Sequence, residues 1–204
     1  MINKSYPVKI SIKNIFTLSI PIFFSNLALP LVGVVDTGLM GNLGEAKYLA
    51  ATSIATSVLT MVIWSFGFLR MGTVGIIAQS FGKGEYREIT RTIMRNFLIA
   101  IIIALIIILC KPIIISSINF FFLTSSNTQD LINTYISVRI FSVPAELTIY
   151  ILIGFYLGLQ KTKISSLLII TLSILNIFFS SYFVLSMNLD IFGAALGTLI
   201  ASYL

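Results

Sequence analysis

Four charged side chains lie inside long apolar runs: Asp36, Arg70, Arg139 and Glu146. A charge at mid-membrane costs about 2.5–3.5 kcal/mol on insertion scales, so each one indicates a function or a paired partner. Asp36 is the strongest candidate, because a carboxylate in a dry cavity is costly when ionised and less costly when protonated. We therefore predict that Asp36 takes up and releases a proton or a sodium ion. The alternative is an interfacial carboxylate that water reaches near the outer end of its helix.

The segment around Asp36 carries a stripe of small and polar residues. Residues three, four and about eleven positions apart share one helix face. This spacing predicts an interior-facing stripe made of Ser25, Gly33, Asp36 and Met40. Pro21 and Pro30 fall in the same apolar run. Because proline frees backbone groups and bends a membrane helix, these two positions predict a helix that moves.

Arg139 and Glu146 are seven residues apart, two helical turns along one face, with Pro144 between them. Proline should bend this helix. The arginines can extend to an interface or pair with a carboxylate. A structural role is favoured over a functional one for Arg70, Arg139 and Glu146, and the role of each stays open.

Two further apolar runs carry small and polar stripes at helical spacing. One stripe is Ser173, Asn176 and Ser180; another is Ala194, Thr198 and Ser202; beside it runs a ridge of Gly193, Gly197 and Ala201. Such patterns permit close contact between membrane helices and hydrogen bonds across them. Simple helix packing is the favoured interpretation for most of these residues.

The composition explains why these residues must be positioned by membrane helices. The chain has 204 residues, 57% of them hydrophobic and 10% charged, whereas soluble domains carry about 25% charged residues. The sequence has no histidine and one cysteine, Cys110, which leaves no disulfide framework and no Cys/His metal site. An enzyme is disfavoured, and neither a metal nor a cofactor is expected.

A spanning helix needs about 20 apolar residues. Residues 1–204 therefore predict an all-α membrane protein with five full spans and part of a sixth, at 15–40, 49–78, 93–118, 131–159, 165–185 and 193–204. The second span is long enough to require tilt. The sixth reaches about 18 Å of a roughly 30 Å hydrocarbon core. We interpret the chain as one that stops within this helix, as a split or truncated reading frame would.

Basic residues are distributed unevenly between the two sides of these spans. The segments assigned to one side hold Lys4, Lys9, Lys13, Lys83, Arg87, Arg91, Arg95, Lys161 and Lys163, and the other side holds only Lys47 and Lys111. Because cytoplasmic loops collect Lys and Arg, this bias predicts a cytoplasmic N-terminus. The same rule accounts for the net charge of +6 without nucleic-acid binding.

Several strings spread over the chain resemble the multidrug and toxic compound extrusion (MATE) family, in its DNA-damage-inducible protein F-like branch. They are VGVVDTGLMGNLG, GFLRMGTVGIIAQSFGKG, VRIFSVPAE, LGLQKTK and NLDIFGAALGTLIA. The resemblance implies the N-terminal six-helix lobe of a twelve-helix, two-lobed transporter. It also implies export of small cationic or amphipathic compounds across the bacterial inner membrane in exchange for protons or sodium.

The resemblance implies roles for individual positions. Asp36 matches the cation-coupling carboxylate, and Pro21 the proline about which the first helix bends. Asn176 and Thr198 match members of the same polar network. Ser180 stands where the family pattern has a second carboxylate. This departure weakens any sodium site and favours H⁺ over Na⁺.

The leading hypothesis is thus the N-terminal half of a multidrug antiporter, either split or decayed, with a separately encoded C-terminal lobe as partner if it functions. The alternatives are a membrane fragment without transport activity and a lipid-precursor flippase of the same superfamily. Flippases of that kind tend to hold arginines in their central cavity, and the MATE-like strings together with Asp36 argue against one here. Under each of these hypotheses, membrane lipid is an expected partner.

Overall fold

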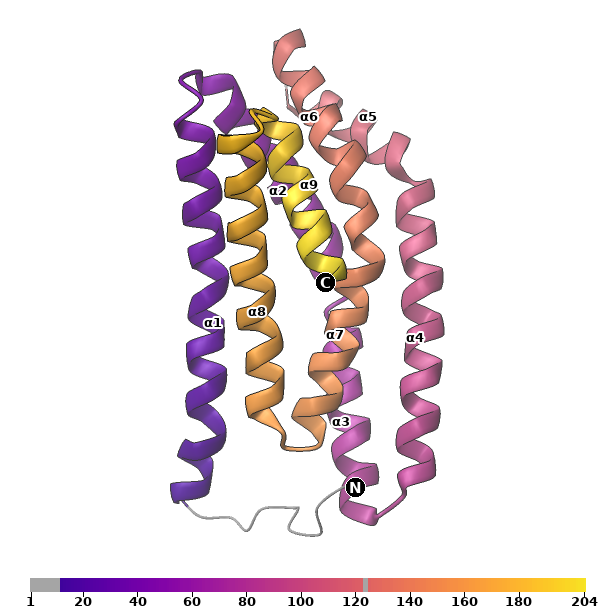
Figure 1. Cartoon of the computed structure of the whole chain (residues 1–204). Helices are drawn as coiled ribbons and strands as arrows, with labels where there is room; N and C mark the ends of the chain where they lie inside the picture. Colours follow the sequence, from indigo (N-terminus) through magenta and orange to yellow (C-terminus); the bar gives the residue numbers. More distant parts are fainter. Residues whose placement is uncertain (1–11, 123–124) are drawn as a thin grey trace.

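The computed structural model describes residues 12–122 and 125–204, and these are arranged as a bundle of helices (Figure 1). Their bounds are α1 Ile12–Gly41, α2 Ala46–Trp64, α3 Phe68–Lys83, α4 Tyr86–Leu109, α5 Lys111–Phe121, α6 Ser126–Arg139, the 3-10 turn η1 Ile140–Ser142, α7 Val143–Gly158, α8 Thr162–Ser181, the wide turn η2 Tyr182–Ser186 and α9 Asp190–Tyr203.

Five stretches of the described residues are long and apolar enough to cross a membrane. They are α1, α2 with α3, α4, α6 with α7, and α8 with η2, while α9 is a shorter apolar helix of 14 residues. Their outward faces carry large exposed apolar side chains, such as Leu98, Ile102 and Leu105 on α4. The expected all-α membrane fold with five full spans and a shorter sixth helix is confirmed.

The second span is interrupted, which corrects the single tilted helix expected over residues 49–78. α2 ends at Trp64, a turn covers residues 65–67, and α3 begins at Phe68. The Ser65 hydroxyl bonds back to the Met61 carbonyl, and the Gly67 amide bonds to the Trp64 carbonyl at 2.9 Å. Hydropathy could not reveal this break, because the apolar run continues through it.

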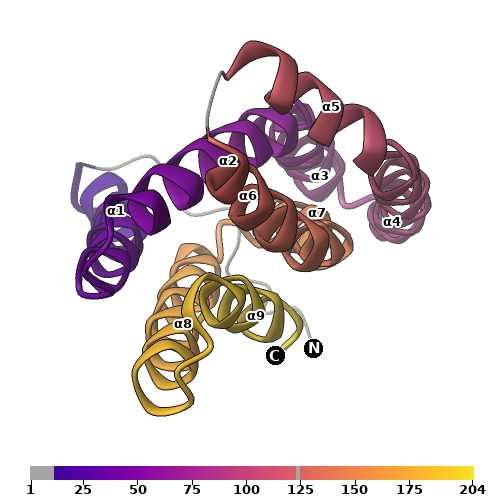
Figure 2. The same cartoon turned by 90° about the horizontal axis from the view of Figure 1, so that it is seen from above.

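The third span also differs from the expected range of 93–118. α4 begins earlier, at Tyr86, so most of the polar stretch after α3 is helical and only residues 84–85 separate the two helices. α4 ends at Leu109, and α5 is a separate helix that lies across the end of the bundle (Figure 2). Pro112 stands in the first turn of α5, where its missing N–H removes no helical hydrogen bond.

The fourth span is interrupted where Pro144 predicted a bend. α6 ends at Arg139, the 3-10 turn η1 covers three residues, and α7 begins at Val143 with the proline in its first turn. Because proline cannot continue the hydrogen bonding of the preceding turn, the span is divided into two halves, α6 and α7. This expectation is confirmed.

Glycines allow two of the helix pairs to pack closely. A Cβ added at Gly154 of α7 would lie 2.8 Å from the Arg70 carbonyl oxygen on α3, and one at Gly158 would lie 2.7 Å from the Ile77 Cβ. On α9, a Cβ at Gly197 would lie 2.5 Å from the Ser180 backbone nitrogen on α8. Small residues at such contacts let helix backbones approach within the membrane.

Candidate functional site

Asp36 lies in the C-terminal part of α1, five residues before the helix ends at Gly41. Its side chain is half-buried, and its Oδ1 atom is buried without a hydrogen-bond partner among the described residues. Met40 and Ser25 of the predicted stripe are fully buried, whereas Gly33 is exposed. Most of the stripe therefore faces the protein, and Gly33 is the position where the prediction is wrong.

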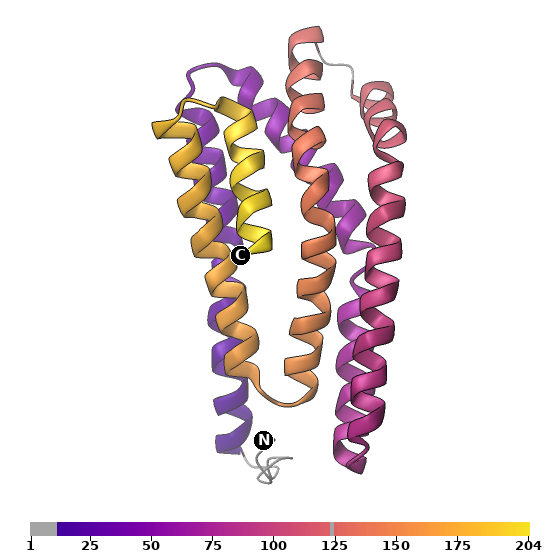
Figure 3. The same ribbon diagram turned by 45° about the vertical axis from the view of Figure 1, so that its right-hand side comes forward.

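α8 packs along α1 (Figure 3) and carries two of the expected polar residues on its buried face. Asn176 is 5% exposed and Ser180 is fully buried. The Asn176 Oδ1 and the Ser180 Oγ both lack a hydrogen-bond partner in the part of the chain that the structure describes. With the Asp36 Oδ1 and the Ser166 Oγ, four buried oxygen atoms of the described α1 and α8 therefore remain unsatisfied, which is uncommon for buried polar groups.

α9 packs against α8 at Ser180. Gly197 meets the backbone of Ser180 directly, so Thr198, the next residue, lies beside this contact. The Thr198 hydroxyl donates to the Ala194 carbonyl at 3.1 Å, and the Ser202 hydroxyl donates to the Thr198 carbonyl at 2.7 Å. Thr198 is therefore satisfied within its own helix, unlike Asn176 and Ser180.

Pro21 is half-buried in α1, and the helix continues without interruption from Ile12 to Gly41 through both prolines. The chain therefore adopts one long helix here in spite of the missing backbone donor at Pro21. A hinge at this residue stays a prediction, because it concerns a change between two conformations.

A polar cluster occupies the break in the fourth span. Arg139 donates to the Glu146 carboxylate and to the Ser142 hydroxyl, and the Ser142 Oγ lies 2.8 Å from the Glu146 Oε1. The side chains of Arg139 and Glu146 are 15% and 17% exposed. Of the two options open from the sequence, pairing with a carboxylate is the one that Arg139 takes.

Tyr135 was not among the residues predicted from the sequence. Tyr135 of α6 is 3% exposed, and its hydroxyl accepts a hydrogen bond from the Thr56 hydroxyl of α2 at 3.2 Å. Tyr135 interacts electrostatically with both Arg139 and Asp36. The signal that could have found it is its spacing, since it lies four residues before Arg139 and so on the same helix face.

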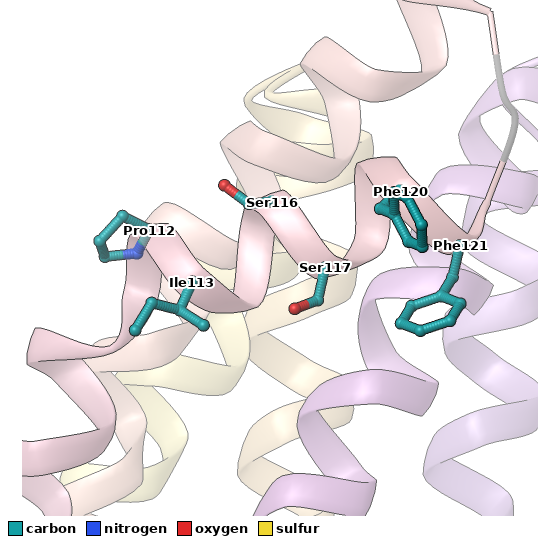
Figure 4. Close-up of a pocket in the computed structure, with 6 residues that line it drawn as sticks. All are labelled: Pro112, Ile113, Ser116, Ser117, Phe120 and Phe121. Carbon is teal, nitrogen blue, oxygen red and sulfur yellow. The ribbon is translucent and has the colours of Figure 1, made fainter.

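A shallow depression lies elsewhere, on the outer surface of α5 (Figure 4). Its lining residues come from three successive turns of that helix and are Pro112, Ile113, Ser116, Ser117, Phe120 and Phe121. None of them is titratable or among the predicted site residues. The predicted site residues lie instead on α1, α8 and α9, and the Arg139–Glu146 pair lies on α6 and α7.

Comparison with known proteins agrees with this arrangement. The MatE family model matches residues 21–182. The chain is 31% identical over 191 residues to the DNA damage-inducible protein F of Escherichia coli (strain K12), covering 94% of this chain and 42% of that protein. It is 26% identical over 172 residues to a probable multidrug resistance protein NorM of Listeria monocytogenes, covering 84% of this chain and 38% of that protein.

Solved structures show the same fold. A multidrug resistance MATE family transporter in its outward-facing conformation matches with a TM-score of 0.86 at 21% identity, covering 94% of this chain and 42% of that one. A MATE protein in complex with MaD3S matches with a TM-score of 0.87, also at 21% identity, covering 94% and 43%. The chain spans less than half the length of the relatives it matches. It therefore belongs to the MatE family of transporters, in which it corresponds to the N-terminal half.

Proposed function

We propose that this chain is the N-terminal lobe of a cation-coupled multidrug exporter of the bacterial inner membrane. The observation that carries the proposal is the group of unpartnered buried oxygens on α1 and α8, from Asp36, Asn176 and Ser180. Leaving a buried acceptor without a donor costs about 1–3 kcal/mol. A proton on Asp36, or a cation between the two helices, would supply the missing partner.

The same residues favour H⁺ over Na⁺ as the coupling ion. Asp36 is the only carboxylate of the three, and Ser180 supplies a neutral hydroxyl where a second negative charge would favour a metal cation. A proton needs only one acceptor, whereas hard cations are bound by sets of oxygen ligands in which carboxylates are prominent. Asp36 therefore binds and releases the proton, and the polar side chains of Asn176, Ser180 and Thr198 form its supporting network.

The proposed orientation places the N-terminus in the cytoplasm. Among the described residues, Lys83, Arg87, Lys161 and Lys163 flank the hairpins α3–α4 and α7–α8 at one end of the bundle, where α1 also begins, while Lys47 lies at the opposite end (Figure 1). Lys4 and Lys9, which the sequence bias also used, lie outside the described residues. The positive-inside rule assigns the end richer in basic residues to the cytoplasm.

Cysteine labelling tests this orientation. In a chain with Cys110 replaced by alanine, Lys47→Cys should react with a membrane-impermeant maleimide added to intact cells, since it lies at the outer end of α2. Lys161→Cys should react only after the membrane is permeabilised. Labelling of Lys161→Cys in intact cells, at the level of Lys47→Cys, would contradict the assignment.

Transport requires a second lobe in this proposal, because the relatives are more than twice as long as the part that this chain matches. The partner is a C-terminal lobe, with which this lobe forms a central cavity for small cationic or amphipathic compounds. Large exposed side chains such as Phe178 and Tyr182 on α8 and its following turn leave apolar surface available to lipid and to that lobe.

The test is reconstitution with a complementary lobe. The chain is co-expressed with the C-terminal half of the E. coli DNA damage-inducible protein F in a pump-deficient host, and outward transport of an ethidium-like cation is measured in vesicles with an imposed proton gradient. We expect gradient-driven export from the pair and none from this chain alone. Export by the chain alone, or a pair that assembles without export, would contradict the proposal.

A further inference from the structure

Arg139 is held at the break between α6 and α7 by groups from both sides. Its guanidinium contacts Glu146 in the first turn of α7 and Ser142 in η1. The Ser142 hydroxyl also lies 2.6 Å from the Arg139 carbonyl oxygen. The contacts of one side chain therefore join the two halves of this span across the turn that divides it.

The C-terminal part of α1 and the face of α6 that carries Tyr135 border one hydrophobic cluster, together with residues of α2 and α9. Leu39 and Met40 of α1 share one hydrophobic cluster with Tyr135 of α6. Asp36 lies one helical turn before Met40, and Arg139 one turn after Tyr135. Because α1 runs toward the outer end and α6 away from it (Figure 1), both positions lie one turn inward from these two cluster residues. Arg139 and Asp36 interact electrostatically across this gap.

Four charged side chains lie in this region. Asp36 and Glu146 are two carboxylates that interact electrostatically with Arg139, and Tyr135 interacts with all three. The second guanidinium, Arg70 of α3, interacts with Tyr150 of α7, which also interacts with Glu146. Glu146 already contacts Arg139, whereas the Asp36 Oδ1 is buried without a partner in the described chain. A guanidinium carries five N–H donors, and the contacts of Arg139 with Glu146 and Ser142 both use a single nitrogen, Nη1.

We propose that Arg139 is a counter-ion shared by Glu146 and Asp36. When Asp36 is ionised and holds no cation, the guanidinium bonds to both carboxylates and draws α1 toward the break between α6 and α7. When Asp36 is neutralised, Arg139 bonds to Glu146 alone and α1 is released. Arg139 is thus a positioning residue that transmits the charge of Asp36 to the divided span. The change in the charge of Asp36 during transport rests on the proposed function, but the sharing of Arg139 between the two carboxylates does not.

A double-mutant cycle tests the sharing without any transport measurement. Asp36→Asn, Glu146→Gln and the double variant of the 204-residue chain are placed in lipid nanodiscs, and the thermal unfolding midpoint of each is measured. If Arg139 is shared, either single variant leaves it one carboxylate, so each midpoint falls modestly. The double variant leaves a buried cation without a carboxylate partner, so its midpoint should fall well beyond the sum of the two single shifts.

Adding Arg139→Gln to the double variant should then restore much of the lost midpoint, because it removes the unpaired cation. This triple variant also keeps the test decisive if the double variant fails to fold, since it should recover the folded chain. Asp130→Asn, an exposed carboxylate on α6, serves as the matched control and should combine additively with Glu146→Gln. Additive shifts for Asp36→Asn with Glu146→Gln, or no recovery in the triple variant, would overturn the shared counter-ion whether or not the assembled protein exports.

Discussion

Replacing Asp36 with asparagine in an assembled two-lobe transporter is expected to reduce gradient-driven export to the background level while the protein remains in the membrane. Asparagine keeps the size and much of the hydrogen-bonding capacity of aspartate, but it cannot bind and release a proton. The transporter would therefore remain in one conformational state and could not complete its cycle. The measurement is efflux of an ethidium-like cation from vesicles that hold equal amounts of each variant.

The physical reason for so large an effect is the placement of the carboxylate. The Oδ1 of Asp36 is buried without a hydrogen-bond partner among the residues that the structure describes, and Arg139 and Tyr135 of α6 interact with this side chain electrostatically. Neutralising Asp36 removes a negative charge between α1 and the divided span of α6 and α7. A bound proton shifts an equilibrium between two conformations only by the difference in its affinity for them. In our proposal, protonation lets α1 bend near Pro21 and reduces the cavity, which releases the exported compound.

The matched control for this experiment is Asp130→Asn, since Asp130 is an exposed aspartate near the start of α6. It makes the same chemical change away from the buried oxygens, and export should stay at the wild-type rate. Wild-type export in Asp36→Asn at equal protein level would leave Asp36 as an ordinary structural carboxylate. Cation coupling would then have to depend on another titratable group.

Much of this fold could be predicted because lipid enforces a simple pattern. Each full span was found from the length of its apolar run, and the break at Pro144 from the chemistry of proline. The seven-residue spacing of Arg139 and Glu146 predicted one helix face, and the ion pair forms across a 3-10 turn that preserves it. Features that depend on one residue type, or on the helical period, could therefore be predicted directly from the sequence.

Features that depend on contacts between helices could not be predicted in this way. The break at residues 65–67 and the separate helix α5 lie inside apolar runs that hydropathy treats as continuous, although Pro112 was a usable signal for the start of α5. The unsatisfied oxygens of Asn176 and Ser180 are visible only once α8 is packed against its neighbours. Sequence could name these residues, but not whether each had a partner.

Replacing Gly197 with valine is expected to disrupt the lobe itself. A Cβ at this position would lie 2.5 Å from the backbone nitrogen of Ser180, 2.6 Å from its Cα and 2.6 Å from its Oγ. Two of these three atoms belong to the backbone of α8, so no side-chain rotation can relieve the overlap. α8 and α9 must separate, and overpacking of this kind costs about 1–3 kcal/mol or more.

The loss should appear as a lower thermal unfolding midpoint and a smaller monodisperse fraction after extraction into detergent. Gly75→Val is the matched control, because Gly75 is exposed within α3 and has no neighbouring heavy atom within 4 Å of an added Cβ. It makes the same change in a helix without a clash, so its midpoint should stay close to wild type. Equal midpoints for the two variants would mean that α9 does not pack on Ser180 as described, and the Thr198 placement that follows from that contact would fall with it.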